Sequence, residues 1–170
     1  MKTLLLQASS RSGGNTHQIV TLLQEHLQAD LIDLWGKNIG PYDYEHRNSG
    51  DDFLPTMRRV VEYDRIIFVT PVYWYSMSAT LKLFFDRLTD CLKVEKDLGR
   101  RLRGKTMAAV ACGSDDVVTE GFFVPFRNTA GYLGMTYAGN LHTWVVEGEE
   151  VPEEVKLRVE KFCFNYHAFR

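Results

Sequence analysis

Residues 65–70 read Arg-Ile-Ile-Phe-Val-Thr, and residues 71–78 continue as Pro-Val-Tyr-Trp-Tyr-Ser-Met-Ser. A short unbroken run of β-branched and aromatic residues is typical of a strand that is buried on both faces. The next residues carry three consecutive aromatic rings, which are costly to expose unless they cover a ligand or pack in an interface. Ser78 then begins a predicted helix with one apolar face, formed by Leu81, Phe84, Phe85, Leu88 and Leu92.

The same alternation of apolar runs and amphipathic helices extends in both directions along the chain. Further strands are predicted at residues 2–7, 30–34, 106–112 and 135–141, and helices at 16–28, 52–61, 122–132 and from 152 onward. Gly139 and Asn140 weaken the last strand. Five strands alternating with five helices predict an α/β three-layer sandwich, in which helices cover both faces of a parallel sheet. Right-handed crossovers favour the flavodoxin-like strand order 2-1-3-4-5, with ligands bound beyond the carboxyl ends of the strands.

The composition narrows the class of protein. The chain has 170 residues, a formal net charge of −2 and 45% hydrophobic residues, which indicates a single globular domain over residues 1–170. A charge this small gives no general attraction to nucleic acid, and no apolar run is long enough for a membrane span. The start of the chain does not resemble a signal peptide. We therefore expect a cytoplasmic protein. The three cysteines and five histidines lack the spacing of a metal site.

The loop between the first predicted strand and helix reads Ala-Ser-Ser-Arg-Ser-Gly-Gly-Asn-Thr over residues 8–16. Its glycines, hydroxyl groups and arginine, together with the positive end of the next helix, suit a phosphate dianion. The loop lacks the Gly-Lys-Ser/Thr ending of a nucleotide P-loop, the G-x-G-x-x-G of a dinucleotide site and the cysteine of a phosphatase. The pattern therefore favours holding a phosphate without cleaving it, although a plain polar turn also fits the loop taken alone.

We call residues 8–16 the first loop and residues 71–78 the second loop. A third loop follows the fourth predicted strand and reads Ala-Cys-Gly-Ser-Asp-Asp over residues 111–116. Its small residues allow a ligand to approach the backbone, although an ordinary strand-ending turn would look the same. All three loops follow parallel strands, so they are expected to meet at one edge of the sheet. Lys82 and Arg87 are expected on the solvated face of their helix, and the acidic residues near Glu147 in a solvated loop.

Taken together, residues 9–16, 70–82 and 86–87 resemble the NAD(P)H-dependent FMN reductase family, close to its iron–sulfur flavoprotein branch. The resemblance runs from the first strand to about the fourth. It implies FMN as the cofactor, with its phosphate in the first loop and its ring along the second and third. The candidate cofactor-binding residues are Ser9, Arg11, Ser12, Gly14, Asn15, Thr16, Pro71, Val72, Tyr73, Trp74, Tyr75, Ser76, Gly113 and Ser114.

The sequence also departs from the family pattern. Ala8 stands where glycine is usual, and residues 39–44 lack the cluster cysteines of the iron–sulfur branch, so no cluster is expected. Asp115 and Asp116 would repel a reduced flavin anion, so both are not expected to point toward the ring. The segment 35–50 is long, aromatic and irregular, and is expected to cover the ring or to meet a second subunit. The resemblance also implies a homodimer or homotetramer.

The resemblance implies an oxidoreductase in which the flavin carries the chemistry and no side chain acts as a nucleophile. A nicotinamide, NADH or NADPH, would pass hydride to FMN, and a quinone, azo, nitro or flavin acceptor would then be reduced. One alternative is a flavodoxin-type electron carrier without nicotinamide turnover. A non-redox module that binds another phosphorylated molecule is a second. A receiver domain is a weaker third, because Ala8 and Ser9 replace the acidic pair that it requires.

Overall fold

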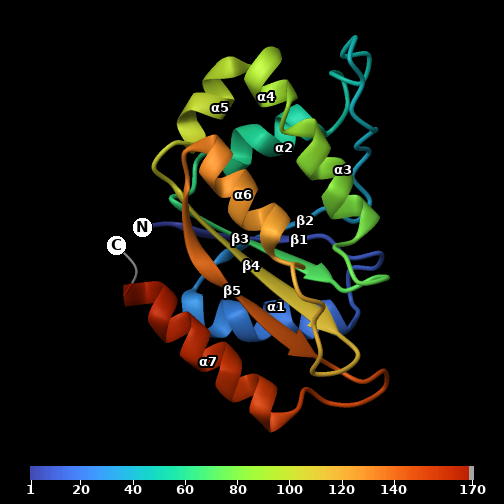
Figure 1. The fold of residues 1–170 in the computed structure, drawn as a ribbon, viewed down its shortest axis with the longest axis vertical. Helices are drawn as coiled ribbons and strands as arrows, with labels where there is room; N and C mark the ends of the chain where they lie inside the picture. The colour runs from blue at the N-terminus through green and yellow to red at the C-terminus, as the bar shows by residue number, and fades with distance from the viewer. Residues whose placement is uncertain (169–170) are drawn as a thin grey trace.

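The computed structural model describes the backbone of residues 1–168 and the side chains of residues 1–166. Its centre is a five-stranded sheet in the order β2-β1-β3-β4-β5 (Figure 1), and every neighbouring pair of strands is parallel. This confirms the predicted flavodoxin-like α/β fold. The strands are β1 (Thr3–Gln7), β2 (Asp30–Asp33), β3 (Arg65–Pro71), β4 (Thr106–Gly113) and β5 (Thr136–Trp144).

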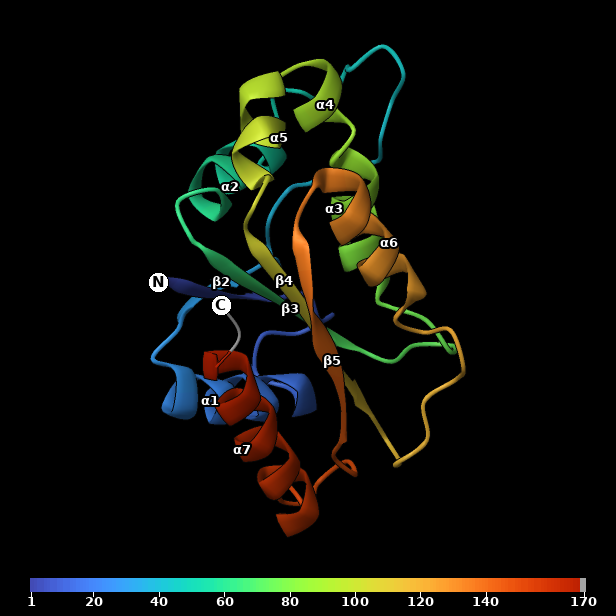
Figure 2. The same cartoon turned by 60° about the vertical axis from the view of Figure 1, so that its left-hand side comes forward.

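Helices cover both faces of the sheet (Figures 1 and 2). Along β1, Leu4 and Leu6 face one hydrophobic core and Leu5 faces the other, because successive side chains of a strand point to opposite faces. One core packs under α1 (Asn15–Leu27) and α7 (Glu153–Ala168). The other packs under α2 (Phe53–Val60), α3 (Ala79–Arg87), α5 (Lys96–Leu102) and α6 (Val124–Leu133), with α4 (Asp90–Lys93) at its end.

The helix after β3 is shorter than the sequence pattern predicts. The pattern predicts a helix that continues to Leu92, but α3 ends at Arg87, and the short helices α4 and α5 follow. Ser78 does cap α3, since its hydroxyl accepts a bond from the Leu81 N–H at 3.1 Å. The same hydroxyl donates to the Ala8 carbonyl at 2.6 Å. This contact ties the start of α3 to the end of β1.

Arg87 is buried, so the expectation that it lies on the solvated face of α3 is wrong. Its side chain is 1% exposed and donates to Asp51 and, at 2.7 Å, to Asp90. It also donates to the carbonyls of Gly40 and Asn48, each at 3.1 Å. The guanidinium therefore fixes the long segment between β2 and α2 against the start of α4. Lys82 is exposed as expected, and pairs with Asp86 one turn along the helix.

The last strand is longer than predicted and contains a bulge. Met107 pairs with Tyr137 and Ala109 pairs with Asn140, so β5 carries one extra residue against β4. Gly139, which weakened the sequence prediction, has a φ of +114° at this bulge. Beyond it, pairing continues to Trp144. The extra length brings residues 145–150 to the edge where the other strands end.

Candidate functional site

Two adjoining pockets lie at the carboxyl ends of the strands, and both include Val72, Gly113 and Ser114. The first, the Arg11 pocket, has a volume of about 240 Å³. Its other lining residues are Ser9, Arg11, Asn15, Thr16, Pro71, Tyr73, Cys112, Val145 and Glu147. The second, the Asp115 pocket, has a volume of about 350 Å³, and its other lining residues are Trp74, Tyr75, Asp115, Val117 and Thr119.

The structure brings most of the predicted site residues together. Three of them line neither pocket and support the loops instead. The Ser12 carbonyl accepts a bond from the buried Gln7 amide at 2.9 Å, and Gly14 is the N-cap residue of α1. Ser76 closes the turn that begins at Tyr73. None of residues 35–50 lines either pocket, so this segment does not cover the site within this chain. The alternative expectation, that it meets a second subunit, stays a prediction.

The loops that surround the Arg11 pocket are bonded to one another. The Ser10 hydroxyl lies 2.6 Å from the Tyr73 hydroxyl, which joins the first loop to the second. The Asn15 amide donates to the Val145 carbonyl at 2.8 Å, which joins the first loop to the segment after β5. These cross-links hold the pocket walls in place before any ligand arrives.

The Arg11 end of the site has the chemistry of an anion-binding site. The N-terminus of α1 has no side-chain cap and no acidic residue in its first turn, so its free N–H groups and its dipole favour a negative charge. The Ser9 and Thr16 residues are each 3% exposed, yet both line the pocket. Arg11 folds over the glycine turn, where a Cβ at Gly14 would lie only 2.5 Å from its Nε. This set of donors fits a phosphate ester.

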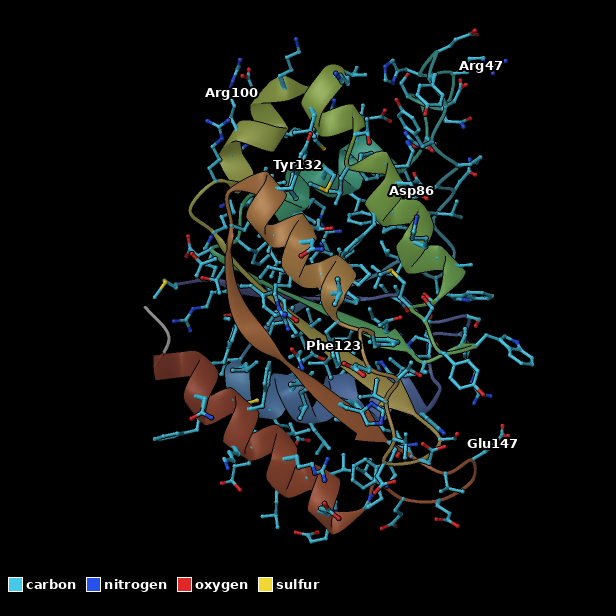
Figure 3. The ribbon with its side chains drawn as sticks, viewed as in Figure 1. Arg47, Asp86, Arg100, Phe123, Tyr132 and Glu147 are labelled. Atoms are coloured by element: carbon cyan, nitrogen blue, oxygen red, sulfur yellow. The ribbon has the colours of Figure 1, made fainter. Side chains whose placement is uncertain are left out.

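Glu147 brings an opposing charge to the same pocket. Its carboxylate lies 3.7 Å from the Arg11 guanidinium, and the two side chains are 85% and 60% exposed. Figure 3 shows Glu147 near the ends of the strands, at the far end of the molecule from Arg47 and Arg100. An exposed pair at this distance contributes little to stability. Its effect is instead on the charge that an incoming anion meets.

Gly113 lines both pockets, and the space on the side where a side chain would stand is already filled. A Cβ at Gly113 would lie 3.1 Å from the His142 ring and 3.3 Å from the Asp115 carbonyl. Beside it, Cys112 is 4% exposed, and burial raises the pKa of its thiol to about 11. At neutral pH this cysteine is therefore a neutral thiol and a poor nucleophile.

The second loop ends in a strained turn. The N–H of Ser76 donates to the Tyr73 carbonyl at 3.1 Å, and the two residues between them, Trp74 and Tyr75, have φ values of +48° and +65°. Two successive positive φ values belong to a type I′ turn, which normally contains Asn-Gly. Trp74 is 93% exposed and Tyr75 71% exposed. The turn therefore presents two large rings to solvent beside the Asp115 pocket at a cost in backbone energy.

Replacing Trp74 with asparagine and Tyr75 with glycine is expected to raise the free energy of unfolding by about 1–2 kcal/mol, because the strain at both positions is relieved. Urea unfolding monitored by circular dichroism measures the change. The matched control is the double alanine variant, which removes the rings and keeps the strain. Equal stability of the two double variants would show that the turn is not strained.

Several lining residues were missed by sequence reasoning. Val145 and Glu147 were missed because the predicted strand ends at residue 141, whereas β5 continues past the bulge to Trp144. Val117 and Thr119 were also missed. Their position follows from an Asx turn that starts at Asp115, whose carboxylate accepts the Val117 N–H at 3.0 Å. The Asp-Asp pair at 115–116 was the available signal, and of these two residues only Asp115 lines a pocket.

The described residues form neither a metal site nor a membrane-spanning helix. In this part of the chain, no group of three or more His, Cys, Asp or Glu side chains is placed to hold a metal ion. No helix of residues 1–168 has both the length and the apolar character needed to cross a bilayer.

Comparison with protein families gives one match that covers most of the chain. The family model described as NADPH-dependent FMN reductase matches residues 1–150. A relative from Bacillus subtilis, named as the NAD(P)H-dependent FMN-containing oxidoreductase YwqN, is 30% identical over 149 residues, which are 82% of each chain. The iron-sulfur flavoprotein MJ1083 of Methanocaldococcus jannaschii is 29% identical over 126 residues, which are 67% of this chain and 63% of its own.

Solved structures with low sequence identity share the fold. The Trp repressor binding protein from Bacillus subtilis superposes with a TM-score of 0.72 at 22% identity, covering 99% of this chain and 98% of its own. General stress protein 14 from Treponema denticola, solved in complex with FMN, has a TM-score of 0.64 at 17% identity, covering 99% and 97%.

Proposed function

This chain belongs to the NADPH-dependent FMN reductase family. From that membership and the pocket geometry we propose that it oxidises a reduced nicotinamide and reduces a quinone, azo, nitro or flavin oxidant through FMN held at the two pockets. The observation that carries the proposal is the pair of adjoining pockets. One has the donors of a phosphate site, and the other is lined by aromatic and small residues. For a quinone oxidant, NAD(P)H, H⁺ and quinone give NAD(P)⁺ and hydroquinone.

The residues present fit FMN. Arg11, Ser9, Asn15 and Thr16 would hold the phosphate with the N-terminus of α1. Pro71 to Tyr75, Gly113 and Ser114 would hold the ring, and Ser12, Gly14 and Ser76 support these loops. FMN, when bound, supplies two-electron redox chemistry that no side chain of the chain provides. The polypeptide would bind and orient the FMN and limit access to it.

No protein nucleophile is required. Cys112 lines the Arg11 pocket, but burial keeps its thiol protonated at neutral pH. Tyr73 lies in the same pocket, where its hydroxyl shares a hydrogen bond with Ser10 and so positions the second loop. The oxidants proposed for this site are quinones, azo and nitro compounds and free flavins.

Steady-state oxidation of NADH and NADPH, followed at 340 nm with a quinone present, tests the proposal. Turnover that depends on FMN supports it. The acidic residues along this edge also suit a basic protein partner, as in a flavodoxin-type carrier. Retained FMN without nicotinamide turnover would favour that alternative, and failure to bind FMN would contradict both.

Glu147 is expected to weaken FMN binding, because its carboxylate lies beside the arginine that would hold the phosphate. Glu147→Gln should lower the dissociation constant of FMN by about two- to fivefold at low salt. Titration followed by flavin fluorescence measures the change. Riboflavin lacks the phosphate, so its dissociation constant should not change. Glu149→Gln is the control, because Glu149 belongs to the same loop and lines neither pocket. A larger effect of Glu149→Gln would contradict this role of Glu147.

A further inference from the structure

Negatively charged side chains outnumber positively charged ones in the lining of the two pockets. Among the lining residues, Arg11 is the single cation, and Glu147 and Asp115 are the anions. The loops at this edge, residues 8–16, 71–78, 113–120 and 145–150, contain no other lysine or arginine. They contain four further acidic residues, which are Asp116, Glu120, Glu149 and Glu150. Once a phosphate binds at Arg11, no positive side chain of these loops remains for a second anion.

The Asp115 pocket contains one charged side chain, and its position is fixed. The Asp115 carboxylate accepts the Val117 N–H at 3.0 Å, which holds the side chain in an Asx turn. The Asp115 carbonyl accepts a bond from Nε2 of His142 at 3.0 Å. His142 is 8% exposed and lies on β5, so it ties this loop to the sheet. The negative charge is thus held at a defined place on the wall rather than on a mobile side chain.

The remaining lining of this pocket is uncharged. Val72, Trp74, Tyr75 and Val117 supply apolar and aromatic surface, and Gly113 adds uncharged backbone. Most of these residues would hold the FMN ring, so an oxidant that approaches the bound ring would meet the Asp115 carboxylate and the exposed aromatic rings beside it. Both favour a cationic group on the oxidant over an anionic one.

We propose that Asp115 makes this site selective for the charge of its oxidant, so that neutral and cationic aromatic oxidants are accepted and anionic ones, such as sulfonates, are disfavoured. The inference rests on the proposed function, and names the oxidant class for the same site. His142 acts as a positioning residue, because it holds the Asp115 backbone without lining the pocket.

Binding of redox-inert probes tests this without relying on turnover. Three naphthalenes of similar size, with a trimethylammonium, a carboxamide or a sulfonate substituent, are titrated into the FMN-loaded protein, and quenching of tryptophan fluorescence is followed. At low salt the cationic probe is expected to bind about tenfold more tightly than the anionic one, with the neutral probe between them. Raising the ionic strength should reduce this ratio.

Asp115→Asn and Asp116→Asn form a matched pair of variants. Asparagine preserves the turn acceptor at position 115, and Asp116 is an exposed neighbour that lines neither pocket. Asp115→Asn should reduce the cation-to-anion ratio to about threefold, and Asp116→Asn should change it by less than twofold. Equal affinities for the three probes in the unaltered protein, or equal effects of the two substitutions, would overturn the inference.

Kinetics then separates this inference from the proposed function. The ratio of kcat/KM for riboflavin and free FMN as oxidants should favour uncharged riboflavin, and Asp115→Asn should raise kcat/KM for FMN about threefold. Turnover that is independent of oxidant charge would contradict the proposed selectivity and still support the proposed function. A protein that binds FMN and oxidises no nicotinamide would contradict the proposed function, whatever the probes show.

Discussion

Arg11→Ala is expected to raise the dissociation constant of FMN by about ten- to 150-fold. A charge-assisted hydrogen bond to an anion contributes about 1.5–3 kcal/mol, and Arg11 is the one cation that lines the pockets. Removal of the guanidinium also leaves Glu147 without its partner, so a negative charge would face the phosphate alone. Equilibrium titration of the apoprotein, followed by flavin fluorescence, measures the effect.

Two controls make the result specific. Riboflavin should bind Arg11→Ala about as tightly as the unaltered protein, because it has no phosphate. Arg100→Ala should leave FMN affinity unchanged, because Arg100 lies on α5, far from the strand ends in Figure 3, and pairs with Asp97. An equal loss of riboflavin and FMN affinity would show that Arg11 supports the loop rather than the phosphate.

Arg87→Met is expected to lower the free energy of unfolding by about 3–5 kcal/mol. The substitution keeps much of the side-chain volume but leaves Asp51 and Asp90, both nearly buried, without their common partner. Two backbone carbonyls of the segment before α2 also lose their donor. Urea unfolding measures the loss. Lys82→Met is the control on the same helix, because its pair with Asp86 is exposed and contributes only about 0.5 kcal/mol.

The same cluster gives stability a defined dependence on pH. Burial raises the pKa of Asp51, but the bonds from Arg87 and from two backbone N–H groups outweigh it, so the pKa lies below its ordinary value of 3.8. A carboxyl whose pKa is lowered by folding stabilises the protein above that ordinary value, and the contribution is lost as the pH falls through the folded pKa. In Arg87→Met the free energy of unfolding should therefore fall less steeply as the pH is lowered. An unchanged slope of this free energy against pH below pH 4 would contradict this.

The fold could be predicted because the pattern of the strands and the connections between them indicate the same architecture. Residues 65–70 form a strand buried on both faces, and such strands belong to parallel sheets with helices on either side. Right-handed crossovers then leave few strand orders for five strands. The end of α3 could not be predicted, because the apolar pattern continues through Leu88 and Leu92 although the helix ends at Arg87.

The candidate site could be predicted in part. The first three loops follow well-marked strands, and the geometry of a parallel sheet brings such loops together. The loop after β5 was missed, because the predicted strand ends at residue 141, whereas β5 continues beyond the bulge at Gly139 as far as Trp144. Arg87 was misplaced because an arginine beside an apolar helix face is usually exposed, and its two buried aspartate partners are visible only in three dimensions.

The central claim is that the strand-end loops hold FMN in a form that a nicotinamide can reduce. The most direct test is the absorption spectrum of the FMN-loaded protein in the absence of oxygen, before and after addition of one equivalent of NADH or NADPH. We predict that the flavin band near 450 nm is lost and returns when a neutral quinone is added. A band that persists with both nicotinamides, in protein that has retained its FMN, would contradict the account.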